Sequence, residues 1–156
     1  MPFMYSEFMT KLMAPRPYPR QPTFDPPRLT LLPKPIAECT IGLFVSCGVQ
    51  LKDDLPMAET NDLSYRLVHR ERALADLKIS HMTPSRKWAL DDLNVAYPRD
   101  RLIELEDEGV FKSLAPHAVS MVGSITFYTD LLNNVVPRIK HDFDKQGVDL
   151  ALILPF

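Results

Sequence analysis

The sequence has few of the residues that build metal sites or crosslinked scaffolds. It contains two cysteines in 156 residues, Cys39 and Cys47. Their spacing fits neither a disulfide framework nor a set of zinc ligands, so we expect reduced thiols. His69, His117 and His141 lie far apart in the sequence, with no neighbouring Cys or carboxylate at ligand spacing. This scatter argues against a metal site.

Long apolar runs and a strong net charge are also missing. No stretch approaches the roughly 20 uninterrupted apolar residues that a membrane span needs, and the Met-rich N-terminus lacks the apolar region of a signal peptide. The formal net charge is -2, so no basic field favours nucleic acid. Neither a G-x-G-x-x-G motif nor a P-loop is present. We therefore expect a cytoplasmic protein with no membrane or nucleic-acid partner and no cofactor of its own.

Proline, in contrast, is abundant and unevenly placed. Nine of the 15 prolines lie within residues 1–37, and proline fixes φ while removing a backbone donor, so no regular core element is expected there. The same segment is rich in Phe, Tyr, Met and Leu. We interpret residues 1–37 as an extended arm, with a short amphipathic helix at 4–13, that docks on the domain or on another subunit. The alternative is a disordered tail.

The rest of the chain, residues 38–156, carries the pattern of one α/β domain. Residues 39–46 are apolar throughout, which predicts a strand covered on both faces. Residues 63–69 alternate like a half-buried strand. Residues 148–156 have the length and composition of a buried parallel strand. Shorter strands are expected at two further places, 78–81 and 114–122, the second interrupted by Pro116.

Helices are predicted between these strands. Residues 73–77 suit a single helical turn, and residues 91–98 suit a loop or a short strand. Asp100 is a candidate N-cap for a helix through residue 108 that Gly109 ends. A longer helix is predicted from Thr129, with Gly147 as its C-cap and Pro137 either kinking it or marking a break. Together these elements predict a parallel or mixed sheet with flanking helices, an incomplete Rossmann-like or flavodoxin-like half.

Candidate site residues cluster after two predicted strands, where sites form in open α/β sheets. Cys47 follows the first strand and is a candidate nucleophile if positive neighbours lower its pKa; a buried, inert thiol is the alternative. His81 follows another strand and can act as a general acid or base because histidine titrates near neutrality. The run after Cys47 also holds Gln50, Lys52 and Asp53, although a polar loop explains these residues equally well.

The order of several short stretches resembles the selenoprotein B type subunits of the glycine, sarcosine, betaine and D-proline reductases. It is most similar to the selenocysteine subunit of D-proline reductase. The matching stretches, in family order, are residues 48–53, 62–67, 79–81, 92–94 with 97–98, 100–102, 114–117 and 146–149. The sequence departs from the family at Val95, where a cysteine is common, and in the residues that follow His81.

The resemblance implies a selenocysteine or cysteine in a Sec-x-x-Cys or Cys-x-x-Cys pair directly after the strand that follows Gly147. It also implies a pyruvoyl group on a partner subunit, which nothing in these 156 residues could form. The sequence ends at the position where the pair is expected. We therefore expect either a chain cut short at a selenocysteine codon or a naturally short chain completed by another polypeptide.

By this resemblance, the chain is a component of a reductase that cleaves a C–N bond of a small amino acid or amine and is inactive alone. The expected catalytic residues are Cys47 and His81, and the expected substrate-binding residues are Gln50, Lys52, Asp53 and Asn94. An unpaired apolar strand predicts a homo-oligomer or a hetero-oligomer with other reductase subunits. The alternatives are a non-catalytic interaction subunit that docks a partner through the arm, and a small Cys47-dependent enzyme.

Overall fold

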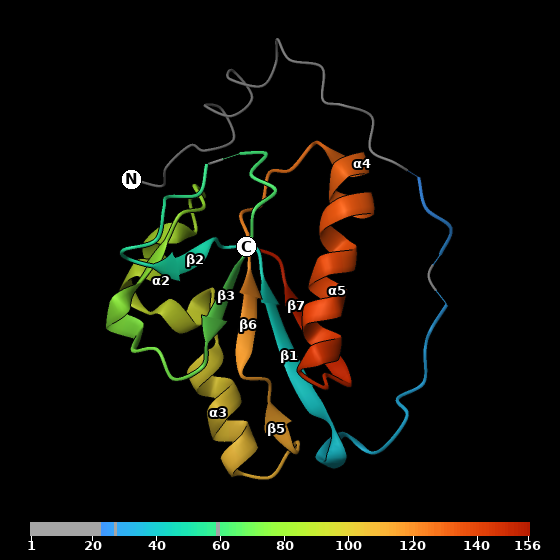
Figure 1. Ribbon diagram of the computed structural model, residues 1–156. Coiled ribbons are helices and arrows are strands. Elements are labelled where there is room, and N and C mark those ends of the chain that lie inside the picture. Colours follow the sequence, from blue (N-terminus) through green and yellow to red (C-terminus); the bar gives the residue numbers. More distant parts are fainter. Residues whose placement is uncertain (1–22, 27, 59) are drawn as a thin grey trace.

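A mixed sheet with helices on its faces forms the body of the molecule (Figure 1). The structure is a computed structural model that describes residues 23–26, 28–58 and 60–156. The central strand β1 (Thr40–Val45) has parallel neighbours on both sides: β5 (Ser113–Leu114) and β6 (His117–Ser120) on one, and β7 (Leu150–Leu154) on the other. The predicted fold class is confirmed.

The remaining strands extend and flank this sheet. β3 (Arg66–His69) pairs antiparallel with β6, and β2 (Val49–Leu51) pairs with β4 (Leu77–Ile79) in a separate two-stranded sheet. The α-helices are α2 (Arg86–Asp91), α3 (Arg99–Asp107), α4 (Tyr128–Asp130) and α5 (Val136–Lys145). Short turns of other helix types are η1 (Ile36–Glu38), η2 (Leu74–Asp76), η3 (Leu93–Val95) and the π-helical η4 (Leu131–Val135).

Strand β1 separates two hydrophobic clusters. Leu43 and Val45 belong to the larger cluster, which also contains Leu102 of α3. Phe44 packs with the smaller cluster beneath α5. Gly42 allows this helix to approach, because a Cβ there would lie 2.9 Å from side-chain atoms of Phe143 and Val148. The apolar sequence of β1 therefore reflects burial on both faces, as predicted.

Strand β7 is parallel to β1, as expected, but it is less buried than its sequence suggested. Its register runs from Leu150 opposite Ile41 to Leu154 opposite Val45. Within the described residues β1 is its only strand neighbour, so one edge of β7 has no partner. Leu152 is 37% exposed and Ile153 is 65% exposed. An apolar run reports that a strand belongs to a core, but it does not report how many neighbours that strand has.

One local prediction near α3 was wrong. Asp100 is not the N-cap: α3 begins after Pro98, and the Asp100 carboxylate accepts hydrogen bonds from Arg99, at 2.8 Å from Nε. Proline fixes φ at the helix entrance, and Asp100 is therefore already inside the first turn. For residues 91–98 the sequence left a loop or a short strand open, and the structure has the non-strand alternative: Asp91 ends α2, and Leu93–Val95 form the turn η3, which the Asp92 side chain caps by accepting from the Asn94 N–H.

The predicted break at Pro137 is confirmed. The long helix consists of α4, the π-helical turn η4 and α5, and Pro137 occupies the first turn of α5. Proline lacks an N–H and its ring crowds the carbonyl four residues earlier, so a widened turn precedes it. Gly147 follows α5 with φ of 67° and ends it in the left-handed conformation, as predicted.

Most of the expected arm, including the short helix at 4–13, lies outside the described residues. In the described part, Leu29 is 97% exposed and Leu31 is 89% exposed. Lys34 attaches this segment to the entrance of β7 through an ion pair of 2.8 Å between Nζ and the Asp149 carboxylate. Among the described residues, no helix has both the length and the apolar character needed to cross a membrane.

Candidate functional site

The ends of β1, β6 and β7 meet at the carboxyl edge of the sheet, where Figure 1 also shows the C-terminus. The Ser46 N–H donates to the Leu154 carbonyl at 3.2 Å, and the Phe156 N–H donates to the Ser46 hydroxyl at 2.9 Å. The Gly48 N–H donates to the Met121 carbonyl beyond β6 at 2.8 Å. These bonds fix the backbone at the edge where open α/β sheets place their sites.

Cys47 and His81, the two candidate catalytic residues, lie side by side at this edge. The His81 N–H donates to the Cys47 carbonyl at 3.1 Å, and the Ser80 N–H donates to the Gly48 carbonyl at 3.0 Å. Both side chains are buried, since Cys47 is inaccessible and His81 is 6% exposed. The antiparallel pairing of β2 with β4 explains this proximity, because it places the start of β2 (Val49) opposite the end of β4 (Ile79).

The Cys47 thiol does not suit nucleophilic chemistry. Burial raises its pKa to about 12, and hydrogen bonds with nearby backbone groups offset only part of that effect. A thiol with this pKa is almost entirely protonated at neutral pH, whereas the thiolate is the reactive form. Cys47 therefore fits the alternative interpretation, a small buried side chain, and it does not fit the role of a reacting thiolate.

The His81 imidazole packs against the backbone of Gly123. A Cβ at Gly123 would lie 3.0 Å from Cε1 and 3.2 Å from Nε2 of His81. Nδ1 is buried and makes no hydrogen bond to any described residue. Burial lowers the pKa of His81, so the ring is neutral at neutral pH and can accept a proton. The arrangement is suited to a general base that a substrate must reach from the carboxyl edge.

Gly48 is required by both its conformation and its surroundings. Its φ is +64°, in the left-handed region that favours glycine, and a Cβ would lie 2.8 Å from Val122 Cγ1 and 3.1 Å from the His81 nitrogen. Any side chain at this position would push apart the segments that carry Cys47 and His81. Gly48 and Gly123 thus let the backbones close around His81.

Gln50 is buried, but its side chain serves the loop beside it. Its Nε2 donates to the carbonyls of Leu55 at 3.2 Å and Asp54 at 3.4 Å. Its Oε1 is buried and has no hydrogen-bond partner among the described residues. That oxygen is the one acceptor through which Gln50 is able to bind a further group.

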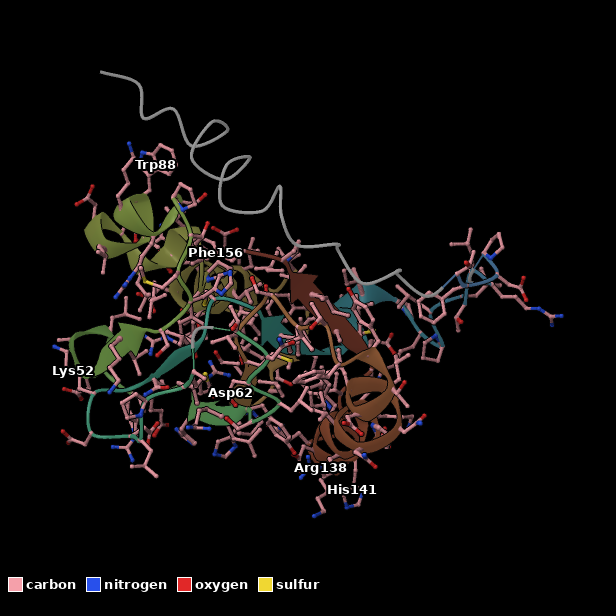
Figure 2. All side chains as sticks on the ribbon, turned by 90° about the horizontal axis from the view of Figure 1, so that it is seen from above. Lys52, Asp62, Trp88, Arg138, His141 and Phe156 are labelled. Carbon is pink, nitrogen blue, oxygen red and sulfur yellow. The ribbon has the colours of Figure 1, made fainter. Side chains whose placement is uncertain are left out.

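The other three expected substrate-binding residues are not gathered around His81. Lys52 and Asp53 are exposed in the turn after β2, and Figure 2 shows Lys52 at the outer margin, well apart from Phe156. Asn94 is occupied locally: Nδ2 donates to Asp92 at 3.1 Å, and Oδ1 accepts from the Asp100 N–H at 3.2 Å. The structure therefore brings Cys47 and His81 together, while Lys52 and Asp53 lie in the turn after β2 and Asn94 lies in the turn η3.

Two residues that the sequence did not single out border the same edge. Asn61 and Ser124 have φ of 54° and 55°, a conformation that L-residues rarely adopt. The Asn61 carboxamide oxygen accepts from the Thr126 N–H at 2.6 Å and from its hydroxyl at 2.9 Å, and the Asn61 N–H donates to the Ser124 carbonyl at 3.2 Å. Strained residues of this kind gather at functional sites. Asn61 and Thr126 are 65 residues apart, and a single sequence does not indicate that residues so far apart are in contact.

Comparison with known proteins finds a significant relative. The chain is 26% identical over 132 residues to D-proline reductase subunit gamma of Acetoanaerobium sticklandii. The chain is distantly related to that reductase family. The match covers 85% of this chain and 54% of the relative, so the chain spans about half the length of the relative it matches. No family model and no solved structure matches.

Proposed function

We propose that this chain is a component of a reductase that cleaves a C–N bond of a small amino acid or amine. The observation that carries the proposal is the distant relation to a D-proline reductase subunit over 85% of the chain. Support comes from the buried His81 beside two close-packed glycines at the carboxyl edge. In this proposal the chain forms one wall of the site, and His81 accepts or returns a proton during bond cleavage.

The reducing group comes from outside residues 1–156 in this proposal. The sequence contains no Cys-x-x-Cys pair, and Cys47 does not fit the role of a reacting thiolate. A selenocysteine or cysteine pair supplies a nucleophile that a second thiol resolves by exchange. The pyruvoyl group expected on a partner subunit activates the substrate. We propose that the chain acts within a hetero-oligomer and is inactive alone.

The test is a reductase assay with dithiothreitol as the electron donor. D-proline and glycine are offered to the chain alone and to the chain mixed with candidate partner subunits. We expect turnover in the mixture only, and we expect His81→Gln to lower kcat by roughly 10²-fold or more. His141→Gln is the matched control, because His141 is exposed on α5, away from this edge (Figure 2). Activity from the isolated chain would overturn the proposal that it lacks the reducing pair.

A second experiment examines the coding sequence beyond Phe156. A selenocysteine codon or a Cys-x-x-Cys pair, followed by a further strand and helix, would support a catalytic pair in the same polypeptide. An unrelated downstream frame would assign the pair to another subunit.

A non-catalytic interaction subunit is the second candidate function. It is favoured by the exposed apolar side chains Leu29 and Leu31 in the proline-rich segment. This function predicts that removing residues 1–33 abolishes binding to partner subunits. It also predicts that His81→Gln leaves binding and turnover of the assembled reductase unchanged, which separates it from the first proposal.

A further inference from the structure

A polar pocket lies at the opposite edge of the sheet from His81. It has a volume of about 390 Å³ and is lined by His69, Glu71, Arg72 and His117. His69 ends β3 and His117 begins β6, and the two residues are directly opposite in the antiparallel pairing. Their rings meet edge to face with centroids 4.8 Å apart. The pocket is therefore built on the sheet itself, with the turn after β3 as its rim.

The pocket offers a free guanidinium donor, and the exposed Glu71 carboxylate lies at its rim. The Arg72 guanidinium makes no hydrogen bond or ion pair with the described residues, and neither does the His117 ring. The neighbouring Arg70, in contrast, is held by Glu106 at 2.6 Å and points to α3. Arg72 is thus available to a ligand, and the planar guanidinium suits two-pronged binding of an oxyanion.

The His69 tautomer favours an anion over a metal cation. Its Nδ1 accepts a hydrogen bond from the Glu71 N–H at 3.3 Å, so the proton of the neutral ring resides on Nε2. A ring nitrogen that carries a proton donates to an anion and does not ligate a metal. No group of three potential metal ligands is found among the described residues.

Charged and polar groups from two segments of the chain surround the two rings. Glu71 and Arg72 face the rings from the turn after β3; the Glu71 carboxylate is 3.9 Å from His69 and is 84% exposed. From the C-cap of α5, the neutral Gln146 side chain accepts the backbone N–H of His117 at 2.7 Å. The Phe143 and Asp144 carbonyls at the end of α5 already accept hydrogen bonds from the backbone N–H groups of residues 146–148. The Arg72 guanidinium is therefore the cationic group that an anion in this pocket would meet.

We propose that this pocket binds a compact oxyanion, the carboxylate or phosphate-like group of a small ligand. Arg72 supplies the permanent charge, and His69 and His117 supply ring N–H donors. The site is separate from the proposed reductase chemistry, since the two histidines lie at the amino end of β6 and the candidate base lies beyond its carboxyl end.

The experiment is an NMR titration of the histidine ring protons in the full chain at constant ionic strength. Sulfate is the probe for a tetrahedral oxyanion and acetate is the probe for a carboxylate, since neither changes charge appreciably between pH 6.0 and 7.5. We expect saturable shifts of the His69 and His117 signals, with the His141 signal unmoved.

Arg72→Gln should weaken binding about tenfold, as expected for loss of a charge-assisted pair. Arg101→Gln is the matched control, because Arg101 is exposed on α3 and pairs only with Glu104 among the described residues. Saturation by sulfate alone, by acetate alone or by both supports the proposal and identifies the ligand group. Linear shifts of all four histidines, equal affinity in Arg72→Gln, or saturation by Zn²⁺ but by neither anion would overturn it.

Discussion

His81 and the pair His69–His117 occupy opposite ends of the same sheet in contrasting environments. His81 is buried against Gly123 with one ring nitrogen that lacks a described partner. His69 and His117 line an open pocket beside the Glu71 carboxylate and the Arg72 guanidinium. Burial lowers the pKa of His81 and favours its neutral ring, whereas the other two rings face open space and charged neighbours. The contrast teaches that residue type alone does not define a histidine's chemistry; its neighbours select a proton acceptor or a donor.

The closely packed end should be the less tolerant of substitution, and Gly48→Ala tests this most strongly. The alanine backbone would have to keep the left-handed conformation of Gly48, and the new Cβ would lie 2.8 Å from Val122 Cγ1. We expect about 3 kcal/mol of lost stability, from backbone strain and overpacking together. Gly109→Ala is the matched control, because φ is +74° there and no described atom lies within 4 Å of the Cβ. It should cost about 1 kcal/mol, by urea denaturation. Equal losses would show that the packing around His81 is looser than described.

The same burial makes the protein sensitive to alkali through Cys47. The folded thiol has its pKa raised from 9.0 to about 12, so the unfolded chain loses this proton first. Stability contributed by the protonated thiol is present below pH 9 and is lost as the pH rises from 9 to 12. By pH 10.5 wild type should lose about 2 kcal/mol more than Cys47→Ala, measured as the change in unfolding free energy from pH 8.5. Parallel losses in both proteins would contradict a buried, protonated thiol.

His81 predicts a loss of stability in acid. Burial lowers the pKa of the folded ring below its unfolded value. The unfolded chain therefore binds the proton more readily, and stability is lost as the pH falls through about 6.5. The urea midpoint should fall between pH 7.5 and 5 by less in His81→Gln than in wild type. His141→Gln should retain the wild-type dependence. If the urea midpoint of His81→Gln depended on pH as strongly as that of wild type, the His81 ring would be in contact with water in the folded protein.

The sequence predicted the elements well where the physics is local. The apolar run of β1, the break at Pro137 and the left-handed Gly147 each follow from the chemistry of nearby residues. Asp100 failed as a cap because the competing signal from Pro98 set the helix start. Local pattern also placed Cys47 and His81 after strands, which is why they meet.

The details of the candidate site depend on contacts that no local pattern records. The link between Asn61 and Thr126 joins residues 65 positions apart. The raised pKa of Cys47 results from burial by segments distant in sequence. Likewise, His69 and His117 are 48 positions apart and become a pair only through the register of β3 on β6. Loop residues such as Lys52 were candidates because the composition of a loop does not indicate whether its side chains face a site or the solvent.

The edge strand β7 allows the smallest expected effect on stability and a clear effect on association. Ile153 is 65% exposed and lines an apolar groove of about 330 Å³ with Phe143 of α5. Because little of its surface is buried, Ile153→Lys should change the unfolding free energy by less than about 0.5 kcal/mol. A charge on an unpaired edge opposes strand pairing, so the variant should shift light-scattering mass towards the monomer. Leu105→Lys on α3, 37% exposed, is the control and should leave association unchanged. If light scattering found the wild-type chain to be a monomer, then this edge could associate only with other polypeptides and not with a second copy of the chain.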